Sequence, residues 1–350
     1  MEIETGSEIK TIGPGRAGPG FLNADQKFNR DLTLSFLNTY RPALYLDGFS
    51  ATGIRGLRTE LELGIKTVMV ERSKKSFQIL TENAKRNESQ SELYNDTFES
   101  ILSKYRFDFV DVDPFGDVVP YADISLRYVR NRGFIGFTAT DLSVLTGSLR
   151  EHNLRRYGSV VMNNSFRHEM GIRNLIGFIA RRAVALERGI EVMLSVYHGH
   201  FYRVILQVIK GTDKAESTLK NIGYFNPFKE IDHTYDDFQC GPIWVGNIEG
   251  LFSRGSMNIP RYVSEDYGNR FQQLRYEDMS LFFVDIGDVF SKKKKNLPSL
   301  ANIRNYLENN GIESERTHFS YTGLKVKDKR SVLEKIVNDY DQIYKNHRVN

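Results

Sequence analysis

Between residues 43 and 208 the chain alternates short apolar runs with longer stretches whose apolar residues recur at helical spacing. The apolar runs predict β-strands, and the helical spacing predicts helices before and between them. Strands are expected at 43–46, 67–70, 91–95, 107–112 and 133–137, and helices at 23–39, 52–63, 73–86 and 174–188. Five strands separated by helices predict a parallel, doubly wound α/β sheet with right-handed crossovers.

Two further strands are expected at 191–197 and 201–209, with only three residues between them. Because a parallel crossover needs a much longer connection, these strands must form an antiparallel hairpin. A closing hairpin of this kind separates the class I S-adenosylmethionine-dependent methyltransferase sheet from the related Rossmann dinucleotide-binding sheet. The first turn, residues 47–53, agrees, because its glycines do not form the G-x-G-x-x-G pattern that cradles a pyrophosphate. A dehydrogenase is therefore disfavoured.

The character of the chain changes near residue 213. Residues 212–220 are polar and predict a linker, which divides the chain into a methyltransferase domain, 1–212, and a smaller α+β domain, 213–350. In the second domain we expect a buried strand at 280–285, a helix at 297–310 and a strand pair at 317–319 and 324–326. Such a module fits nucleic-acid binding, but small α+β domains with many other functions look alike. Residues 13–20, rich in Gly and Pro, predict a loop or flap.

Composition narrows the class of protein. Of 350 residues, 40% are hydrophobic and 26% charged, which is ordinary for a soluble protein. No apolar run reaches membrane-span length and the polar start lacks a signal-peptide core, so we expect a cytoplasmic protein without a membrane partner. The single cysteine, Cys240, excludes intrachain disulfides and a cysteine-cluster metal site. A net charge of +4 permits a nucleic-acid partner without requiring one.

Carboxylates stand at the ends of successive predicted strands, where ligands bind in open α/β sheets. Glu71, after the second strand, could accept the two ribose hydroxyls of S-adenosylmethionine. Asp96 with Thr97 beside it, after the third strand, could meet the adenine edge, and Asp47, after the first, could take the ammonium group. Each acid alone is more simply a strand-end cap or a solvated turn. Their recurrence at successive strand ends favours the cofactor.

The same cofactor also needs a cation and close backbone approach. Arg30 and Arg55 are candidates for a salt link to its carboxylate, although Arg30 could equally be a solvated helix charge. Gly48 and Gly53 supply glycines in the first turn, where the backbone must come close to the ligand.

Asp113 is the candidate catalytic residue. It opens an Asp-Pro-Phe-Gly turn directly after the fourth strand. An exocyclic amine is a poor nucleophile because its lone pair is delocalised into the base. A carboxylate that accepts its N–H bonds, helped by the carbonyl of Pro114, could localise that pair and later take the proton. Phe115 would give the base a stacking face. The alternative is a plain tight turn, since Pro and Gly mark turns and Asp starts them.

With these motifs in place, the sequence resembles the tRNA (guanine-26-N2) dimethyltransferases of archaea and eukaryotes, the Trm1 family. The matching segments, KFNRD, DGFSATGIR, DPFG, TATD, GPIWVG and RTHFS, lie at 27–31, 47–55, 113–116, 138–141, 241–246 and 316–320. The resemblance implies one or two methylations of guanosine N2 in tRNA with S-adenosylmethionine. It also implies that the cofactor is contacted by Arg30, Arg55, Glu71 and Asp96. It implies that the base is contacted by Asp113 and Phe115. The residues themselves had already indicated these six positions.

One departure from the family concerns zinc. Family members often carry paired CxxC motifs before the GPIWVG segment, but residues 223–240 hold one cysteine and one histidine here. We therefore expect no metal, and packing among aromatic residues could stabilise the same loop in its place; these are Tyr224, Phe225, Phe228, Tyr235 and Phe238. His168-Glu169 is also not a metal motif, because Ile172 occupies the position of the second histidine.

Two basic stretches could contact RNA phosphates. Residues 292–295 are four consecutive lysines, for which a solvated surface run is the default. The other stretch follows the fifth strand and is rich in arginine, a residue suited to phosphate contacts and base stacking. Its members are Arg150, Arg155, Arg156, Arg167, Arg173, Arg181, Arg182 and Arg188.

Two other functions stay open. An amino-methyltransferase acting on adenine or cytosine in DNA would use the same Asp-Pro-aromatic turn, and the fold could also belong to an RNA-binding protein without activity. The sequence is silent on the number of methyl groups, on neighbouring guanosines, on the set of tRNAs and on oligomeric state. A monomer without an obligate protein partner is our default.

Overall fold

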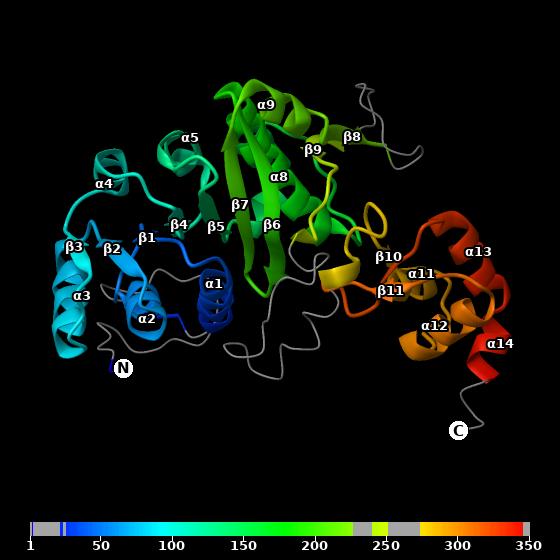
Figure 1. Ribbon diagram of the computed structural model, residues 1–350. Helices are drawn as coiled ribbons and strands as arrows, with labels where there is room; N and C mark the ends of the chain where they lie inside the picture. The colour runs from blue at the N-terminus through cyan, green and yellow to red at the C-terminus, as the bar shows by residue number, and fades with distance from the viewer. Residues whose placement is uncertain (1, 3–21, 24–25, 227–239, 251–273, 346–350) are drawn as a thin grey trace.

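The computed structural model describes residues 2, 22–23, 26–226, 240–250 and 274–345. Its centre is a seven-stranded sheet in the order β3-β2-β1-β4-β5-β7-β6 (Figure 1). The first five strands are parallel, whereas β7 is antiparallel to both β5 and β6. The strands are β1 (Leu44–Asp47), β2 (Lys66–Val70), β3 (Glu92–Tyr94), β4 (Phe109–Val112), β5 (Phe134–Ala139), β6 (Arg188–His198) and β7 (Phe201–Lys210). The predicted parallel sheet and its closing hairpin are confirmed.

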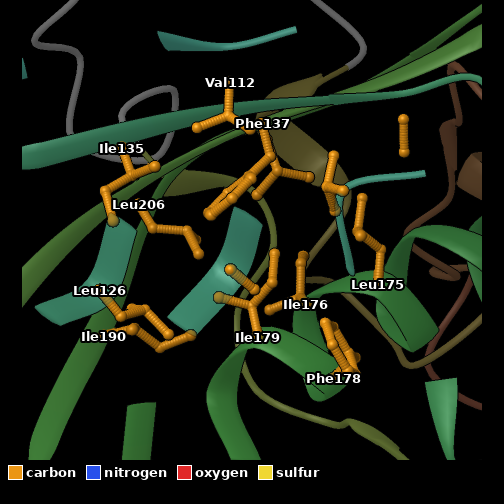
Figure 2. Close-up of a cluster of buried hydrophobic side chains, with 14 of the residues drawn as sticks. Val112, Leu126, Ile135, Phe137, Leu175, Ile176, Phe178, Ile179, Ile190 and Leu206 are labelled. Atoms are coloured by element: carbon orange, nitrogen blue, oxygen red, sulfur yellow. The ribbon is translucent and has the colours of Figure 1, made fainter. Parts of the chain in front are cut away.

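Helices cover both faces of this sheet, as the alternation of the sequence predicts. On one face, α1 packs through Phe28, Leu32 and Phe36 against β1, β4 and β5, beside α2 and α3. The other face carries α4, α5 and α8, whose side chains form the larger core shown in Figure 2. These helices are α1 (Lys27–Tyr40), α2 (Ile54–Leu63), α3 (Lys74–Arg86), α4 (Phe98–Lys104), α5 (Val119–Tyr128) and α8 (Arg167–Ala185), with α6 (Leu142–Leu145) and α7 (Arg150–Tyr157) before α8.

The predicted linker at 212–220 is wrong, because these residues form helix α9 (Thr212–Leu219). Only Ala215 and Thr218 of this helix are buried, so its apolar face is too sparse for a hydrophobic pattern to reveal. The Thr218 hydroxyl accepts a hydrogen bond from the Ile190 backbone N–H of β6 at 2.9 Å. The helix is thus attached to the main sheet.

Strands β8 (Ile222–Phe225) and β9 (Cys240–Trp244) also belong to the main body. Trp244 and Ile248 are part of its larger core, and Arg173 of α8 donates to the backbone carbonyls of Trp244 and Gly246. Most of the loop at 223–240, including Phe228, Tyr235 and Phe238, lies outside the described residues, as does the predicted flap at 13–20. The domain boundary at 212/213 stays a prediction.

The C-terminal part has a separate core around a small three-stranded sheet, β10-β12-β11 (Figure 1). Its elements are β10 (Val284–Asp285), α11 (Ile286–Lys292), α12 (Leu300–Asn309), β11 (Glu315–Arg316), β12 (Gly323–Lys325), α13 (Lys329–Asn338) and α14 (Tyr340–Lys345), preceded by a short 3-10 turn, η3 (Leu274–Tyr276). The predicted helix at 297–310 is confirmed. The predicted strand at 280–285 shrinks to two residues because Phe282 adopts a positive φ of 58°, and the strand pair forms at 315–316 and 323–325.

Gly177 lets α8 lie directly on β9. A Cβ at this position would meet the Trp244 backbone nitrogen at 2.7 Å. We predict that Gly177→Ala forces the helix and the strand apart and lowers the free energy of unfolding by about 1–3 kcal/mol, as overpacked cores do. Urea unfolding measures this loss. Ala185→Ser, at the exposed end of the same helix, should stay within about 0.5 kcal/mol; equal stability of both variants would contradict the tight contact.

Candidate active site

Three carboxylates meet where the central parallel strands end. Asp47 of β1 is in register with Asp111 of β4, and Asp113 follows two residues later. Arg55, at the start of α2, reaches this group from the adjacent turn. Its Nη2 donates to Asp113 Oδ2, and its Nη1 lies 3.6 Å from Asp111 Oδ2. The predicted site residues Asp47, Arg55 and Asp113 therefore lie in one cluster.

Arg203 lies beneath this cluster, and the sequence analysis missed it. The side chain is fully buried in β7 and donates to both oxygens of Asp111, each at 2.8 Å. It also donates to the hydroxyls of Thr138 and Thr33. One signal was present, because position 203 is the only charged residue in an otherwise largely apolar strand at 201–209. A buried charge needs a partner, which points to a carboxylate on the neighbouring strands.

Arg203 and Arg55 give the carboxyl groups of Asp111 and Asp113 pKa values that are shifted in opposite directions. Burial by itself would raise the pKa of Asp111, but Arg203 and Arg55 outweigh it and hold that pKa below its ordinary value. For Asp113 burial wins, and its pKa is raised although Arg55 opposes the shift. Asp111 is therefore a permanent anion, whereas Asp113 is the more basic group, which suits proton transfer.

The turn that contains Asp113 and Phe115 differs from an ordinary turn in the solvent exposure of its side chains. The Asp113 side chain is 22% exposed, Pro114 is buried, and the Phe115 side chain next to them is 70% exposed. The turn is fixed to the end of β5 by a hydrogen bond from the Gly116 N–H to the Thr140 hydroxyl and by one from the Thr140 N–H to the Gly116 carbonyl. A rigid turn that presents an aromatic face beside a carboxylate fits a planar ligand that carries an N–H donor.

Asp47 and Arg30 fit the two charges of an amino-acid zwitterion. Asp47 is buried and accepts a hydrogen bond from the Gly56 N–H, and burial raises its pKa to about 7. Arg30 is also buried; its Nη1 donates to the Asn23 carbonyl, and its Nε has no hydrogen-bond partner in the described part of the chain. Burial, together with Arg55 and Arg58, lowers the pKa of Arg30 to about 10. An ammonium group at Asp47 and a carboxylate at Arg30 would each offset the free-energy cost of burying the charge beside it.

Glu71 and the two glycines of the first turn, Gly48 and Gly53, each have a structural role within the protein. Glu71 accepts backbone hydrogen bonds from Ala51 at 3.0 Å and from Ser73 at 2.7 Å, so its carboxylate lies against the turn. Gly53 has a φ of 83°, and a Cβ there would lie 2.3 Å from Leu80. A Cβ on Gly48 would lie 2.5 Å from the Phe98 ring. The fold requires both glycines before any ligand is considered.

Asp96 and Thr97 occupy the start of α4. Thr97 caps this helix, since its hydroxyl accepts the Ser100 N–H, and Asp96 accepts hydrogen bonds from the Thr97 N–H and the Ser100 hydroxyl. These bonds, led by that of Thr97, lower the pKa of Asp96. The capping role that the sequence offered as an alternative is therefore present in the structure, and a cofactor contact at these two residues stays a prediction.

The arginine-rich stretch divides into structural and exposed members. Arg173 and Arg188 are buried, Arg181 donates to backbone carbonyls, and Arg182 pairs with Asp123. Arg156 bridges Asp117 and Asp141 beside the Phe115 turn. The remaining exposed side chains are those of Arg150, Arg155 and Arg167. All four lysines at 292–295 are exposed.

Among the described residues, no group of three His, Cys, Asp or Glu side chains is placed to hold a metal ion. In the same part of the chain, no helix is both long and apolar enough to cross a membrane.

A parallel sheet closed by an antiparallel hairpin, with acids at the ends of β1, β2 and β4, defines the class I methyltransferase fold. The chain belongs to the N2,N2-dimethylguanosine tRNA methyltransferase family, whose model matches residues 4–338.

Full-length relatives support this membership. A tRNA (guanine(26)-N(2))-dimethyltransferase of Thermoplasma volcanium is 40% identical over 345 residues, covering 97% of this chain and 99% of the relative. The enzyme of the same name from Thermoplasma acidophilum is 38% identical over 93% of each chain. The solved structure of Trm1 from Pyrococcus horikoshii with S-adenosyl-L-methionine superposes with a TM-score of 0.81 at 28% identity, covering 96% of this chain and 99% of that one. The fold and family expected from the sequence are confirmed.

The buried Arg203–Asp111 pair should be essential to the fold. We predict that Arg203→Met lowers the free energy of unfolding by about 3–5 kcal/mol, because Asp111 would remain as a buried charge with one of its two cations missing. Arg182→Met is the matched control, since its Asp123 pair is half exposed and should contribute less than about 1 kcal/mol. Chemical denaturation of both variants measures the difference. Equal losses would show that Arg203 is not a special structural residue.

Proposed function

We propose that the protein transfers methyl groups from S-adenosylmethionine to the exocyclic N2 of guanosine 26 in tRNA, giving mono- and dimethylguanosine. The observation that carries the proposal is the ionised Arg203–Asp111–Arg55 network, which holds a more basic, partly exposed Asp113 beside the exposed Phe115 ring. The family membership and the names of the full-length relatives support the substrate and the position.

Asp113 is the proposed acceptor for the amine. Its carboxylate would accept an N2–H hydrogen bond, which localises the nitrogen lone pair, and would take that proton as the nitrogen gains a methyl group. The Pro114 carbonyl would accept the second N–H, and Phe115 would stack on the guanine. Arg55 keeps the Asp113 carboxylate oriented through their ion pair. The raised pKa of Asp113 makes it a better base than an ordinary aspartate.

S-adenosylmethionine, when bound, supplies the electrophilic methyl group. In our proposal Asp47 holds its ammonium group and Arg30 its carboxylate, because burial raises the pKa of Asp47 and the buried Arg30 Nε has no hydrogen-bond partner in the described part of the chain. Glu71 would accept the ribose hydroxyls, and Asp96 with Thr97 would meet the adenine edge. Arg55 contributes through its position beside Asp113, while the backbone at Gly48 and Gly53 shapes the turn that faces the cofactor.

The C-terminal part would hold the tRNA body. A stacked base must leave the helix before an enzyme can reach its amine, at a cost of a few kcal/mol. We place the functional division near residue 283 and not at 212/213, because α9 and β9 pack on the main body whereas most buried apolar residues of 284–343 form their own core, Phe319 excepted. The monomeric state and the cytoplasmic location expected from the sequence remain predictions.

The reaction is tested with an unmodified tRNA transcript and nucleoside mass spectrometry. We predict that the wild-type protein forms N2-methylated guanosine and that a transcript with adenosine at position 26 gains no methyl group. Asp113→Ala should lower the rate by about 100-fold or more, as loss of a general base does. Asp123→Ala, an exposed aspartate on α5, is the control and should keep full activity. Methylation of duplex DNA in place of tRNA would support the DNA alternative and overturn the assignment.

Cofactor binding should depend on pH through Asp47. The pKa of its carboxyl is about 7 in the free protein, and a bound ammonium group would lower it. Below pH 7 binding must therefore release a proton, so affinity should rise about tenfold per pH unit up to pH 7 and then level off. Calorimetry in two buffers of different ionisation enthalpy measures the released proton. Asp47→Asn should bind weakly at every pH, and a wild-type affinity that is flat from pH 6 to 8 would refute the role of Asp47.

A further inference from the structure

A cavity of about 670 Å³ lies between the main body and the C-terminal part of the chain, outside the cluster around Asp113. Its main-body wall comes from the start of α8 and the β6–β7 hairpin, with His168, Tyr197 and His198. Its other wall comes from α11 and the segment before β12, with Arg316 and Tyr321. The volume is within the range of about 300–1,000 Å³ that small-ligand sites occupy.

We propose that this cavity is a nucleotide subsite that holds a residue of the tRNA strand next to the target guanosine, its phosphate on Arg316 and its base on the aromatic wall. This inference rests on the proposed function and names a second place at which the same substrate is held. Arg167, which lines the cavity, belongs to the arginine-rich stretch that was expected from the sequence to contact RNA phosphates.

The charges of the cavity favour a phosphate. Arg316 forms no ion pair among the described residues; its Nη2 donates to the Tyr321 carbonyl at 3.3 Å, and its buried Nε has no hydrogen-bond partner in that part of the chain. Two acids also line the wall: Asp288 pairs with Lys292, whereas Asp285 accepts hydrogen bonds from the hydroxyls of Ser320 and Thr322 and keeps its negative charge. The exposed Arg167 adds a second cation at the rim. A guanidinium with an unused donor is suited to a phosphodiester oxygen.

The aromatic side chains favour a base. The rings of His168 and Tyr197 are stacked, with their centroids 4.0 Å apart and their planes 12° from parallel. Burial and the neighbouring Arg167 lower the pKa of His168 to about 4, so this ring is neutral at physiological pH and adds to the stacking surface. Tyr321, on the opposite wall, is 75% exposed. Aromatic walls of this kind bind unpaired bases largely without regard to their sequence.

Two series of contacts link the cavity to the candidate active site. The His198 ring lies 4.5 Å from the ring of Phe28, which precedes Arg30 by two residues on α1. The Tyr202 hydroxyl lies 3.4 Å from His168 Nδ1, and Tyr202 pairs with Ala139 at the end of β5. The residue after Ala139 is Thr140, which is bonded to Gly116 of the catalytic turn. In the proposal, the strand that carries the target guanosine continues from the Phe115 turn into this cavity.

The first test compares three variants in steady-state methylation of a tRNA transcript. Arg316→Met and Tyr321→Ala should each raise KM for tRNA roughly tenfold, the size expected for one stacked base or one phosphate contact, with kcat little changed. Arg316→Met should also reduce the salt dependence of log KM by about one ion. Arg330→Met, an exposed arginine on α13, is the matched control and should change neither quantity.

Binding of S-adenosylmethionine by calorimetry checks the fold of each variant, because the cavity lies outside the cofactor site. Variants with normal cofactor affinity and an unchanged KM for tRNA would overturn the proposal. So would a loss of tRNA affinity equal to that of the Arg330→Met control, since general charge and not the cavity would then be responsible.

The second test needs no turnover, so it separates the cavity from the reaction. A photoreactive benzoylphenylalanine in place of Tyr321 should crosslink to a tRNA nucleotide adjacent to position 26, whereas the same residue in place of Arg330 should not. A crosslink at Tyr321 beside position 26 supports the subsite even where methylation fails. A crosslink to a distant part of the tRNA, or to a second copy of the protein, would show that the cavity has another occupant.

Discussion

The buried contact between Arg203 and Asp111 is the interaction on which the site depends. It joins the antiparallel strand β7 to the parallel strand β4 and leaves no freedom to either charge. A Cβ at Gly136 of β5, the strand between them, would lie 2.5 Å from the Arg203 guanidinium. The Arg203 side chain therefore fits in the sheet only because position 136 has no side chain. The closing hairpin, which the sequence indicates only as a feature of the fold, thus supplies one of the two cations of the proposed catalytic centre.

This arrangement explains how two aspartates one residue apart differ in chemistry. Asp111 has two arginines and the Tyr45 hydroxyl, and it remains ionised. Asp113 has only Arg55 as an ion-pair partner, so the effect of burial outweighs that of the cation and its pKa is raised. A fixed negative charge next to it also opposes its ionisation. The Asp111 anion therefore adds to the effect of burial on the pKa of Asp113, which neither residue type would reveal alone.

The sequence predicted most of the fold because its signals are local. The strands, the hairpin and the Asp-Pro-Phe-Gly turn depend on periodicity and turn chemistry within a few residues. Arg203 was missed because its partner is 92 residues away, and α9 because only two of its residues are buried. Arg55 pairs with Asp113, a long-range contact that no local pattern specifies, and its expected contact with a ligand carboxylate stays a prediction.

The junction between the two parts of the chain follows the same physical rule as the catalytic centre. Lys325 of β12 is fully buried and donates to both oxygens of Glu169 on α8, while the Arg173 Nε donates to the same carboxylate. Beside it, the Tyr197 N–H donates to Nε2 of His318, so the Nδ1 of that ring must carry the hydrogen that Glu277 accepts. Buried charges tolerate few geometries, because any displacement leaves them unpaired. The C-terminal part is therefore held in one orientation, and the distance from the catalytic turn to any RNA contact on that part is fixed by the fold.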